Sequence, residues 1–194
     1  MLEKLTRYKI VLASNSPRRR ELMDGLGVPY EVRTMDGIDE SYPPHLQGGD
    51  IAVCISLKKA DAYRRTMASG ELIVTADTIV WLDGQVLGKP KDAEEARRML
   101  RLLSGKTHQV ITGVTLTNTY MTKSFASFSQ VTFAHLTDEE IDYYVERFRP
   151  MDKAGAYGVQ EWIGFIGVER IECYYFNVMG LPVQRLYQEL KRFP

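Results

Sequence analysis

The stretch from Leu72 to Trp81 constrains the fold most, because it is a run of strand-forming residues followed directly by a hairpin signal. Its β-branched and aromatic residues favour a strand. Asp83-Gly84 is typical of a tight turn, which makes Gln85–Leu87 the return strand. The chain is therefore predicted to contain an antiparallel pair of strands here.

The rest of the chain alternates between strand and helix patterns. Further strands are predicted at 9–13, 108–116, 125–134 and 164–171. Helices are predicted at 17–25, 50–67 and 93–103, from Thr137 to about Phe148, and from Pro182 onward. This mixture, with two hairpins, indicates an α/β fold: a mixed, twisted sheet with flanking helices. No domain boundary is visible, and we expect a single domain over residues 1–194.

The composition excludes several classes of protein. The chain has 25 basic and 25 acidic residues, so its net charge is zero, whereas a general nucleic-acid binder is usually basic. Its two cysteines are far apart and its three histidines are scattered, which argues against a disulfide scaffold or a thiolate zinc site. No signal peptide and no apolar stretch of about 20 residues is visible, so we expect a soluble, cytoplasmic protein.

Three consecutive arginines, Arg18–Arg20, stand at the start of a predicted helix. Ser16 suits the N-cap and Pro17 the first helical position. Cations are disfavoured at this end of a helix, where the dipole is already positive. A bound phosphate group would relieve the conflict, because helix N-termini offer free N–H donors. The alternative is a solvated surface face that binds nothing.

Asp77 interrupts the apolar run of the predicted strand. A buried carboxylate without a partner is costly, so it must meet a cation, a metal ion or a hydrogen-bond network, or lie at the end of the strand. The functional interpretation is a metal ligand or a general base at a strand terminus. The structural interpretation is a turn residue or a satisfied core aspartate.

The other candidate residues are separate cations, separate carboxylates and one loop of small residues. Lys89 precedes a helix start, Lys59 lies in a helix, and an acidic segment covers 36–40. The segment 152–160 combines glycines with one lysine, one tyrosine and Gln160, which is either an ordinary flexible loop or a ligand-binding one. No Walker A or GxGxxG pattern is present. Such a set suits a polyphosphate with Mg²⁺ or Mn²⁺ between carboxylates and phosphate oxygens.

Several motifs together resemble the Maf family of nucleoside triphosphate pyrophosphatases. They are LASNSPRRREL, TADTIV, LGKPKDAEEARRML, LSGKTHQVITGV, and DKAGAYGVQ with VMGLPV, in the family's order from about Val11 to Leu190. The chain is most similar to the dTTP/UTP pyrophosphatase branch. This resemblance implies cleavage between the α and β phosphates, which gives a nucleoside monophosphate and pyrophosphate. It also implies an elongated fold of two lobes around a cleft, like that of inosine triphosphatases, and a homodimer.

The resemblance also implies roles for individual residues. Asp77 matches the family's catalytic proton acceptor, and Glu40 joins it as a metal position. The positions that distinguish dTTP and UTP are Arg18, Thr78 and Gln160. The positions tied to phosphate are Ser14, Ser16, Arg18, Lys59, Lys89 and Lys153. Arg19 and Arg20 are expected to point elsewhere around the helix.

The sequence departs from the family pattern at two places. Thr75 replaces the usual glycine before Ala-Asp, and Cys173-Tyr174 replaces Gly-Ser. Both changes are expected to affect packing only. Two other classes of function stay open at this point: a nucleotide-binding regulator of cell division with little turnover, and a nucleic-acid-binding module, against which the zero net charge argues.

Overall fold

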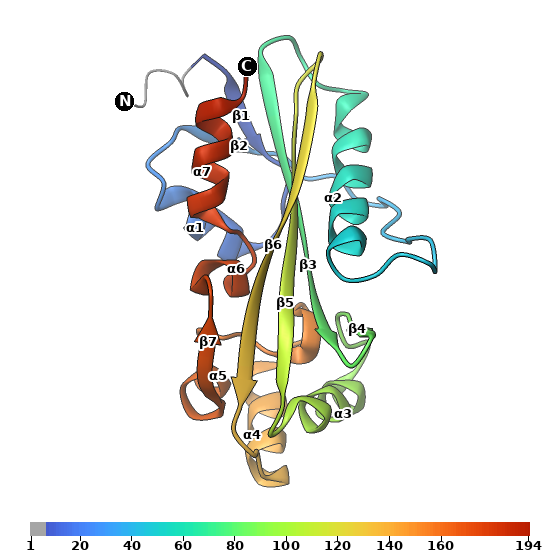
Figure 1. The fold of residues 1–194 in the computed structure, drawn as a ribbon, viewed down its shortest axis with the longest axis vertical. Coiled ribbons are helices and arrows are strands. Elements are labelled where there is room, and N and C mark those ends of the chain that lie inside the picture. Colours follow the sequence, from blue (N-terminus) through green and yellow to red (C-terminus); the bar gives the residue numbers. More distant parts are fainter. Residues whose placement is uncertain (1–6) are drawn as a thin grey trace. The chain divides into compact units, whose positions relative to one another are not determined.

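The computed structural model describes residues 7–194 and contains a seven-stranded mixed sheet with helices around it (Figure 1). The strands are β1 (Lys9–Leu12), β2 (Tyr30–Val32), β3 (Glu71–Leu82), β4 (Gln85–Leu87), β5 (Thr107–Thr117), β6 (Thr122–Phe133) and β7 (Val168–Glu172). The helices are α1 (Pro17–Asp24), α2 (Gly49–Arg64), α3 (Ala93–Leu103), α4 (Asp138–Phe148), α5 (Trp162–Gly167), α6 (Tyr175–Met179) and α7 (Val183–Arg192), with a short 3-10 turn at Ala154–Ala156.

The strands follow the order β2-β1-β3-β5-β6-β7, and β4 pairs with β3. Strand β1 is parallel to both β2 and β3, whereas β4 is antiparallel to β3 and β7 to β6. The turn between β3 and β4 is the predicted Asp83-Gly84 pair, and both residues have positive φ. The predicted α/β class with a mixed sheet is confirmed.

Most predicted elements are present, and one is wrong. Helix α3 has its predicted bounds, and α4 begins with the predicted capping box of Thr137 and Glu140. The segment 164–171 was predicted as a strand, but α5 occupies its first part and β7 begins only at Val168. Its apolar residues do not distinguish a short helix from a strand by pattern alone. The short elements β2 and α6 were not predicted.

Contacts divide the chain into two compact units. Among the described residues, unit 1 contains 7–77, 112–127 and 180–194, and unit 2 contains 78–111 and 128–179. Strand β3 therefore contributes its first half to unit 1 and its second half to unit 2. Within the described residues, 7–194, no helix is long and apolar enough to cross a membrane.

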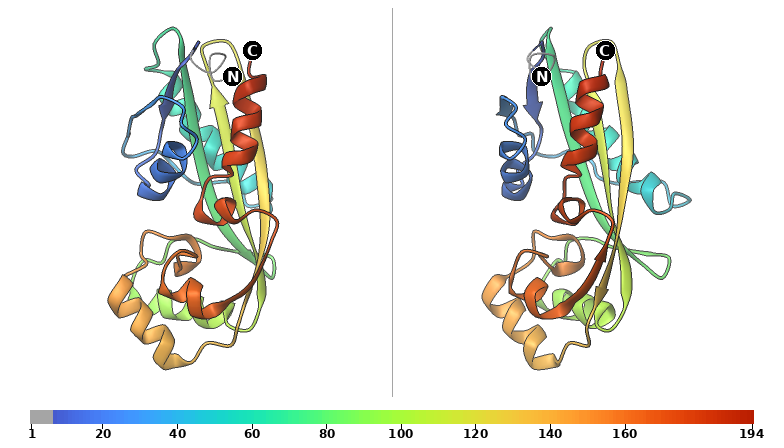
Figure 2. Two further views of the ribbon diagram at one scale, coloured as in Figure 1. Left: turned by 90° about the vertical axis from the view of Figure 1, so that its left-hand side faces the viewer. Right: turned by 60° about the vertical axis from the view of Figure 1, so that its left-hand side comes forward.

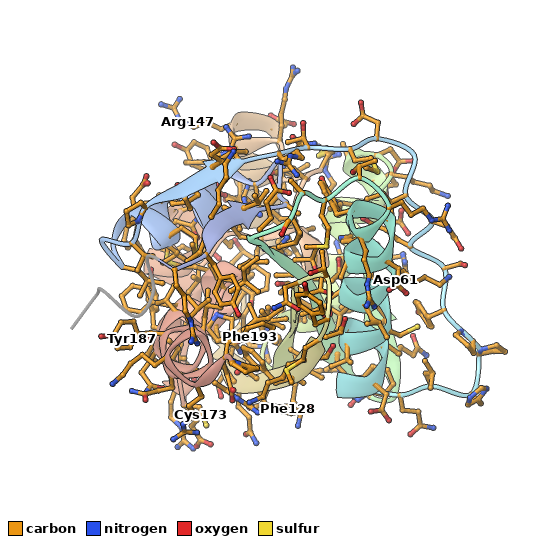
Figure 3. All side chains as sticks on the ribbon, turned by 90° about the horizontal axis from the view of Figure 1, so that it is seen from above. Asp61, Phe128, Arg147, Cys173, Tyr187 and Phe193 are labelled. Atoms are coloured by element: carbon orange, nitrogen blue, oxygen red, sulfur yellow. The ribbon has the colours of Figure 1, made fainter. Side chains whose placement is uncertain are left out.

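In unit 1, α2 and α7 flank the strands on opposite sides (Figures 1 and 2). Helix α2 can approach β5 closely because Gly113 has no side chain: a Cβ there would lie 2.3 Å from the backbone of Ala52. Phe193, which is labelled in Figure 3, follows α7 and is buried. Its ring meets the Tyr8 ring edge-on, with centroids 6.0 Å apart. The close approach at Gly113 holds α2, which carries Lys59, at a defined distance from the sheet.

In unit 2, α3 packs against α4 and against the Ala154–Ala156 turn. The buried rings of His108, Phe133 and Tyr157 form a cluster with edge-to-face contacts and centroids 4.9 to 5.5 Å apart. Tyr157 lies in the glycine-containing segment 152–160. The ring cluster therefore ties that segment to β5 and β6.

Candidate functional site

The Asp77 cluster, which we define as Glu40, Lys59 and Asp77, gathers three predicted site residues in unit 1. The Lys59 Nζ lies 2.7 Å from Asp77 Oδ1 and 2.9 Å from Glu40 Oε1. The Lys59 and Asp77 side chains are only 13% and 14% exposed, whereas that of Glu40 is 49% exposed. Two carboxylates thus converge on one ammonium group, and one of them is largely shielded from water.

Asp77 lies in the interior of β3, so of the alternatives that the sequence left open, the carboxylate meets a cation and does not lie at a strand end. The sheet accepts a carboxylate at this position because Lys59 of α2 supplies the opposite charge. A strand interior also holds the carboxylate in a fixed direction, because β3 lies between β1 and β5 in the sheet.

Thr75, one of the departures from the family pattern, connects β3 to α2. Its hydroxyl donates to the carbonyl oxygen of Ser56 at 2.7 Å, in a buried environment. Thr75 and Asp77 lie two residues apart on the same face of β3, and Ser56 and Lys59 lie three apart on the same face of α2. The hydrogen bond and the ion pair therefore join the same two elements side by side.

Arg19 is a charged residue near this cluster that the sequence analysis placed elsewhere. Its Nε donates to the carbonyl oxygen of Gly180 at 2.8 Å. Burial lowers the pKa of the Arg19 guanidinium, the charge of Arg18 lowers it further, and Asp77 and Glu40 oppose the shift. The charges of Asp77 and Glu40 therefore favour the protonated form of the Arg19 guanidinium. In the sequence, only its place in the arginine run pointed to Arg19. The angular position of a residue on a helix does not predict which groups a long side chain contacts.

The N-terminus of α1 has the predicted cap. Ser16 Oγ accepts a hydrogen bond from the Arg19 N–H at 3.4 Å, and Ser14 Oγ accepts one from the Ser16 N–H at 3.1 Å. Arg18 lies close enough to Arg19 for its charge to affect the Arg19 pKa. Arg20 differs from Arg19, because its Nε is buried and no described residue forms a hydrogen bond with it. Arg19 and Arg20 therefore have different environments.

The Glu161 cluster, which we define as Asp152, Lys153 and Glu161, lies in unit 2. The buried Lys153 Nζ is 2.8 Å from Asp152 Oδ1 and 3.0 Å from Glu161 Oε1. Glu161 was not among the predicted site residues, although it directly follows Gln160. Gln160 is partly buried, and its Oε1 has no hydrogen-bond partner within the described part of the chain. Lys153, predicted to bind phosphate, thus has two carboxylate partners in the folded chain.

The remaining predicted residues lie in unit 2 as well. Thr78 follows Asp77 in β3 and is partly buried. Lys89 is exposed in the connection between β4 and α3. The structure brings Glu40, Lys59 and Asp77 into direct contact, while Lys153 and Gln160 belong to the segment beside Glu161.

His108 forms the other polar contact of this unit. Its Nε2 lies 2.7 Å from the Tyr157 hydroxyl oxygen, inside the ring cluster. Burial lowers the pKa of His108 to about 4 and raises the pKa of the Tyr157 hydroxyl. Both groups are therefore neutral near pH 7. They are suited to holding the segment in place through a neutral hydrogen bond.

The donor chemistry of the Asp77 cluster fits a divalent cation. Carboxylate oxygens are the ligands that Mg²⁺ and Mn²⁺ prefer, and such ions usually take one or two carboxylates plus water and substrate phosphates. Among the described residues, no group of three or more His, Cys, Asp and Glu side chains is arranged to hold a metal ion. A cation at Asp77 and Glu40 would therefore draw its other ligands from water and phosphate.

Comparison with known proteins identifies the class to which this fold and these residues belong. The chain matches the model of the Maf-like protein family over residues 9–193, and it belongs to this family. It is 64% identical to a dTTP/UTP pyrophosphatase of Phocaeicola vulgatus, over 99% of this chain and 100% of that protein. It is 55% identical to a dTTP/UTP pyrophosphatase of Porphyromonas gingivalis, over 100% of this chain and 98% of that protein.

Among solved structures, the chain resembles the Ham1 protein of Staphylococcus aureus with a TM-score of 0.48 and 16% identity. The match covers 65% of this chain and 72% of that one. This likeness is too weak to support an argument about function.

Proposed function

We propose that this protein hydrolyses dTTP and UTP to the nucleoside monophosphate and pyrophosphate. Full-length relatives at 55% to 64% identity carry the name dTTP/UTP pyrophosphatase. The observation that carries the proposal is the Asp77 cluster, in which a shielded carboxylate and an ammonium group lie 2.7 Å apart with Arg19 nearby. Shielded groups of opposite charge are suited to a highly charged substrate and to proton transfer.

The proposal includes a divalent cation, Mg²⁺ or Mn²⁺, held by Asp77 and Glu40. When bound, such an ion stabilises charge on phosphate oxygens and orients them. Lys59 would keep the two carboxylates together and offset their repulsion. We assign Asp77 the further role of accepting the proton of the attacking water.

The cationic side chains would stabilise the triphosphate and the pyrophosphate that leaves. We assign this role to Arg18, Lys59, Lys89 and Lys153, together with Ser14 and Ser16 at the N-terminus of α1. Guanidinium groups suit phosphate because they donate parallel hydrogen bonds in a fixed fork. Arg19 is added to the set, since it lies near Asp77 and Glu40.

Base selection is assigned to Arg18, Thr78 and Gln160. Among residues 7–194, Gln160 Oε1 has no hydrogen-bond partner and is buried, so a ligand N–H that reached it would satisfy it. Uracil and thymine both carry such an N–H and differ by one methyl group, which changes discrimination by only ~1–3 kcal/mol. Both nucleotides should therefore be substrates, whereas purines present a different pattern of donors and a larger outline.

The test is a turnover screen of the purified protein on dTTP, UTP, CTP, ATP and GTP with Mg²⁺ or Mn²⁺, with detection of pyrophosphate. We expect kcat/KM for dTTP and UTP to exceed the values for ATP and GTP at least tenfold, with CTP between them. Equal efficiency on UTP and GTP would overturn the pyrimidine assignment. Release of orthophosphate in place of pyrophosphate would overturn the reaction itself.

The same screen separates this enzyme from a nucleotide-binding regulator of cell division, which would bind UTP without releasing pyrophosphate. We further propose a cytoplasmic homodimer that binds neither nucleic acid nor membranes. Sedimentation of the purified protein at several concentrations tests the dimer. A duplex-binding assay at low salt tests the exclusion of nucleic acid.

A further inference from the structure

Gln160 lies at the end of a loop whose two ends are joined by an ion pair. We call residues 153–160 the selectivity loop. Lys153 begins the loop, and Glu161 is the residue just after the end of the loop. The Lys153 ammonium group lies 3.0 Å from Glu161 Oε1. The Lys153 and Glu161 side chains are only 9% and 20% exposed, so water screens this pair weakly.

Tyr144 of α4 adds a second link. Its hydroxyl donates to Glu161 Oε2 and accepts a hydrogen bond from the Gly158 N–H at 3.0 Å. Tyr144 is fully buried, and burial together with the hydrogen bond to Glu161 raises the pKa of its hydroxyl. One neutral hydroxyl thus connects the middle of the loop to the carboxylate that closes it.

The fit around Glu161 is close. A Cβ on Gly158 would lie 2.8 Å from Glu161 Cδ, so the carboxylate occupies the space that a side chain would need. Gly155 has a φ of +68°, and a Cβ there would lie 2.8 Å from Val80 Cγ2. The loop therefore has little freedom to rearrange while Glu161 stays in place.

We propose that Tyr144 and Glu161 are positioning residues that fix the selectivity loop, and through it Gln160, for recognition of the pyrimidine base. The inference rests on the proposed function for the identity of the ligand, but not for the loop contacts. Glu161 follows Gln160 directly, so a shift of the Glu161 carboxylate moves the Gln160 backbone. Neither residue needs to touch the nucleotide for this effect.

The test compares Tyr144→Phe with Tyr143→Phe. Tyr143 is a matched control because it lies on the same helix and is 45% exposed. Hydrogen exchange of the Gly158 amide reports on the loop without any activity. Binding of non-hydrolysable UTP and GTP analogues and kcat/KM for UTP and GTP report on selectivity. We expect Tyr144→Phe to speed exchange at Gly158 at least tenfold and to narrow the preference for UTP over GTP at least fivefold. Tyr143→Phe should leave both unchanged.

Glu161→Gln is the second variant, because it keeps an acceptor for Tyr144 and removes the charge that pairs with Lys153. It should show a smaller loss of selectivity than Tyr144→Phe, with circular dichroism unchanged. Unchanged Gly158 exchange in Tyr144→Phe would overturn the loop contacts. Faster exchange with wild-type selectivity, in turnover or in analogue binding, would overturn the positioning role. Absence of pyrophosphate release by the wild-type protein would instead refute the proposed function.

Discussion

The Asp77 cluster and the Glu161 cluster solve the same electrostatic problem in different ways. Each surrounds one lysine ammonium with two carboxylates, one largely shielded and one exposed. In the Asp77 cluster the partners come from α2, β3 and a distant loop, whereas in the Glu161 cluster all three residues lie in one short segment. Tertiary packing therefore assembles the first cluster, and local chain geometry assembles the second.

This difference suggests different uses. Groups mounted on a helix and a strand are held precisely, as catalysis requires. A loop closed by its own ion pair can shape a recognition surface without disturbing the sheet. We therefore expect substitutions in the Asp77 cluster to affect the rate of the reaction, and substitutions in the Glu161 cluster to affect the choice of base and the stability of the loop.

Asp77→Asn gives the largest expected effect. The change is nearly isosteric and keeps a hydrogen bond to Lys59, but it removes the charge and the proton acceptor, so turnover should fall about 10²–10⁴-fold. Asp152→Asn alters the exposed carboxylate of the other cluster and should change turnover less than threefold. Wild-type turnover in Asp77→Asn, with unchanged circular dichroism, would remove Asp77 from the mechanism.

The three arginines of α1 should rank by their place in the proposed phosphate-binding set, which includes Arg18 and Arg19 but not Arg20. Arg18→Ala and Arg19→Ala should each reduce kcat/KM for UTP about 10–100-fold, as expected when a charged hydrogen-bond donor is lost. Arg20→Ala should cost less than threefold, because this side chain has a separate environment. Steady-state kinetics with UTP measures kcat/KM for the three variants. Equal losses at all three positions would mean that the helix acts only through its total charge.

Acid should destabilise unit 2 before unit 1. Burial lowers the pKa of His108 from 6.5 to about 4. As the pH falls, His108 is therefore protonated in the unfolded chain before it is protonated in the folded chain. The stabilisation is complete above pH 6.5 and is lost as the pH falls toward 4, for a total of about 3 kcal/mol. The hydrogen bond from Arg33 lowers the pKa of Glu71 in unit 1 to about 2, so its contribution is lost only between pH 4.5 and 2.

Urea unfolding between pH 7.5 and 4 measures this loss, and hydrogen exchange locates it in one unit or the other. His108→Gln should flatten the dependence of stability on pH in this window. If the stability of His108→Gln fell with pH as steeply as that of the wild type, His108 would not be the cause of the pH dependence.

Thr75→Val gives the smallest expected effect. It keeps the shape of the side chain but removes the hydrogen bond to Ser56, so the free energy of unfolding should fall by about 1–3 kcal/mol. Thr75→Ser keeps the hydroxyl and serves as the control. If α2 is positioned through this bond, Thr75→Val should also reduce turnover severalfold, whereas Thr75→Ser should not. Identical urea midpoints for the wild type and Thr75→Val would contradict the role of the hydrogen bond.

The family resemblance pointed to Glu40 and Lys59, whereas the sequence by itself predicted the α/β class, most of the elements and Asp77 as a carboxylate that needs a partner. These depend on local signals: apolar periodicity, caps such as Thr137, the Asp83-Gly84 turn, and a carboxylate within an apolar run. The segment 164–171 was predicted wrongly because short apolar runs carry no reliable period.

Only the tertiary structure decided which charges meet. It placed Lys59 against Asp77, brought Arg19 near the same carboxylate, and closed the selectivity loop with Glu161 and Tyr144. The pattern of side chains along the sequence indicates which residues of one element are buried. Contacts between elements depend on how those elements pack. For this reason the sequence named the charged residues, and the packing of α2 and α4 determined their partners.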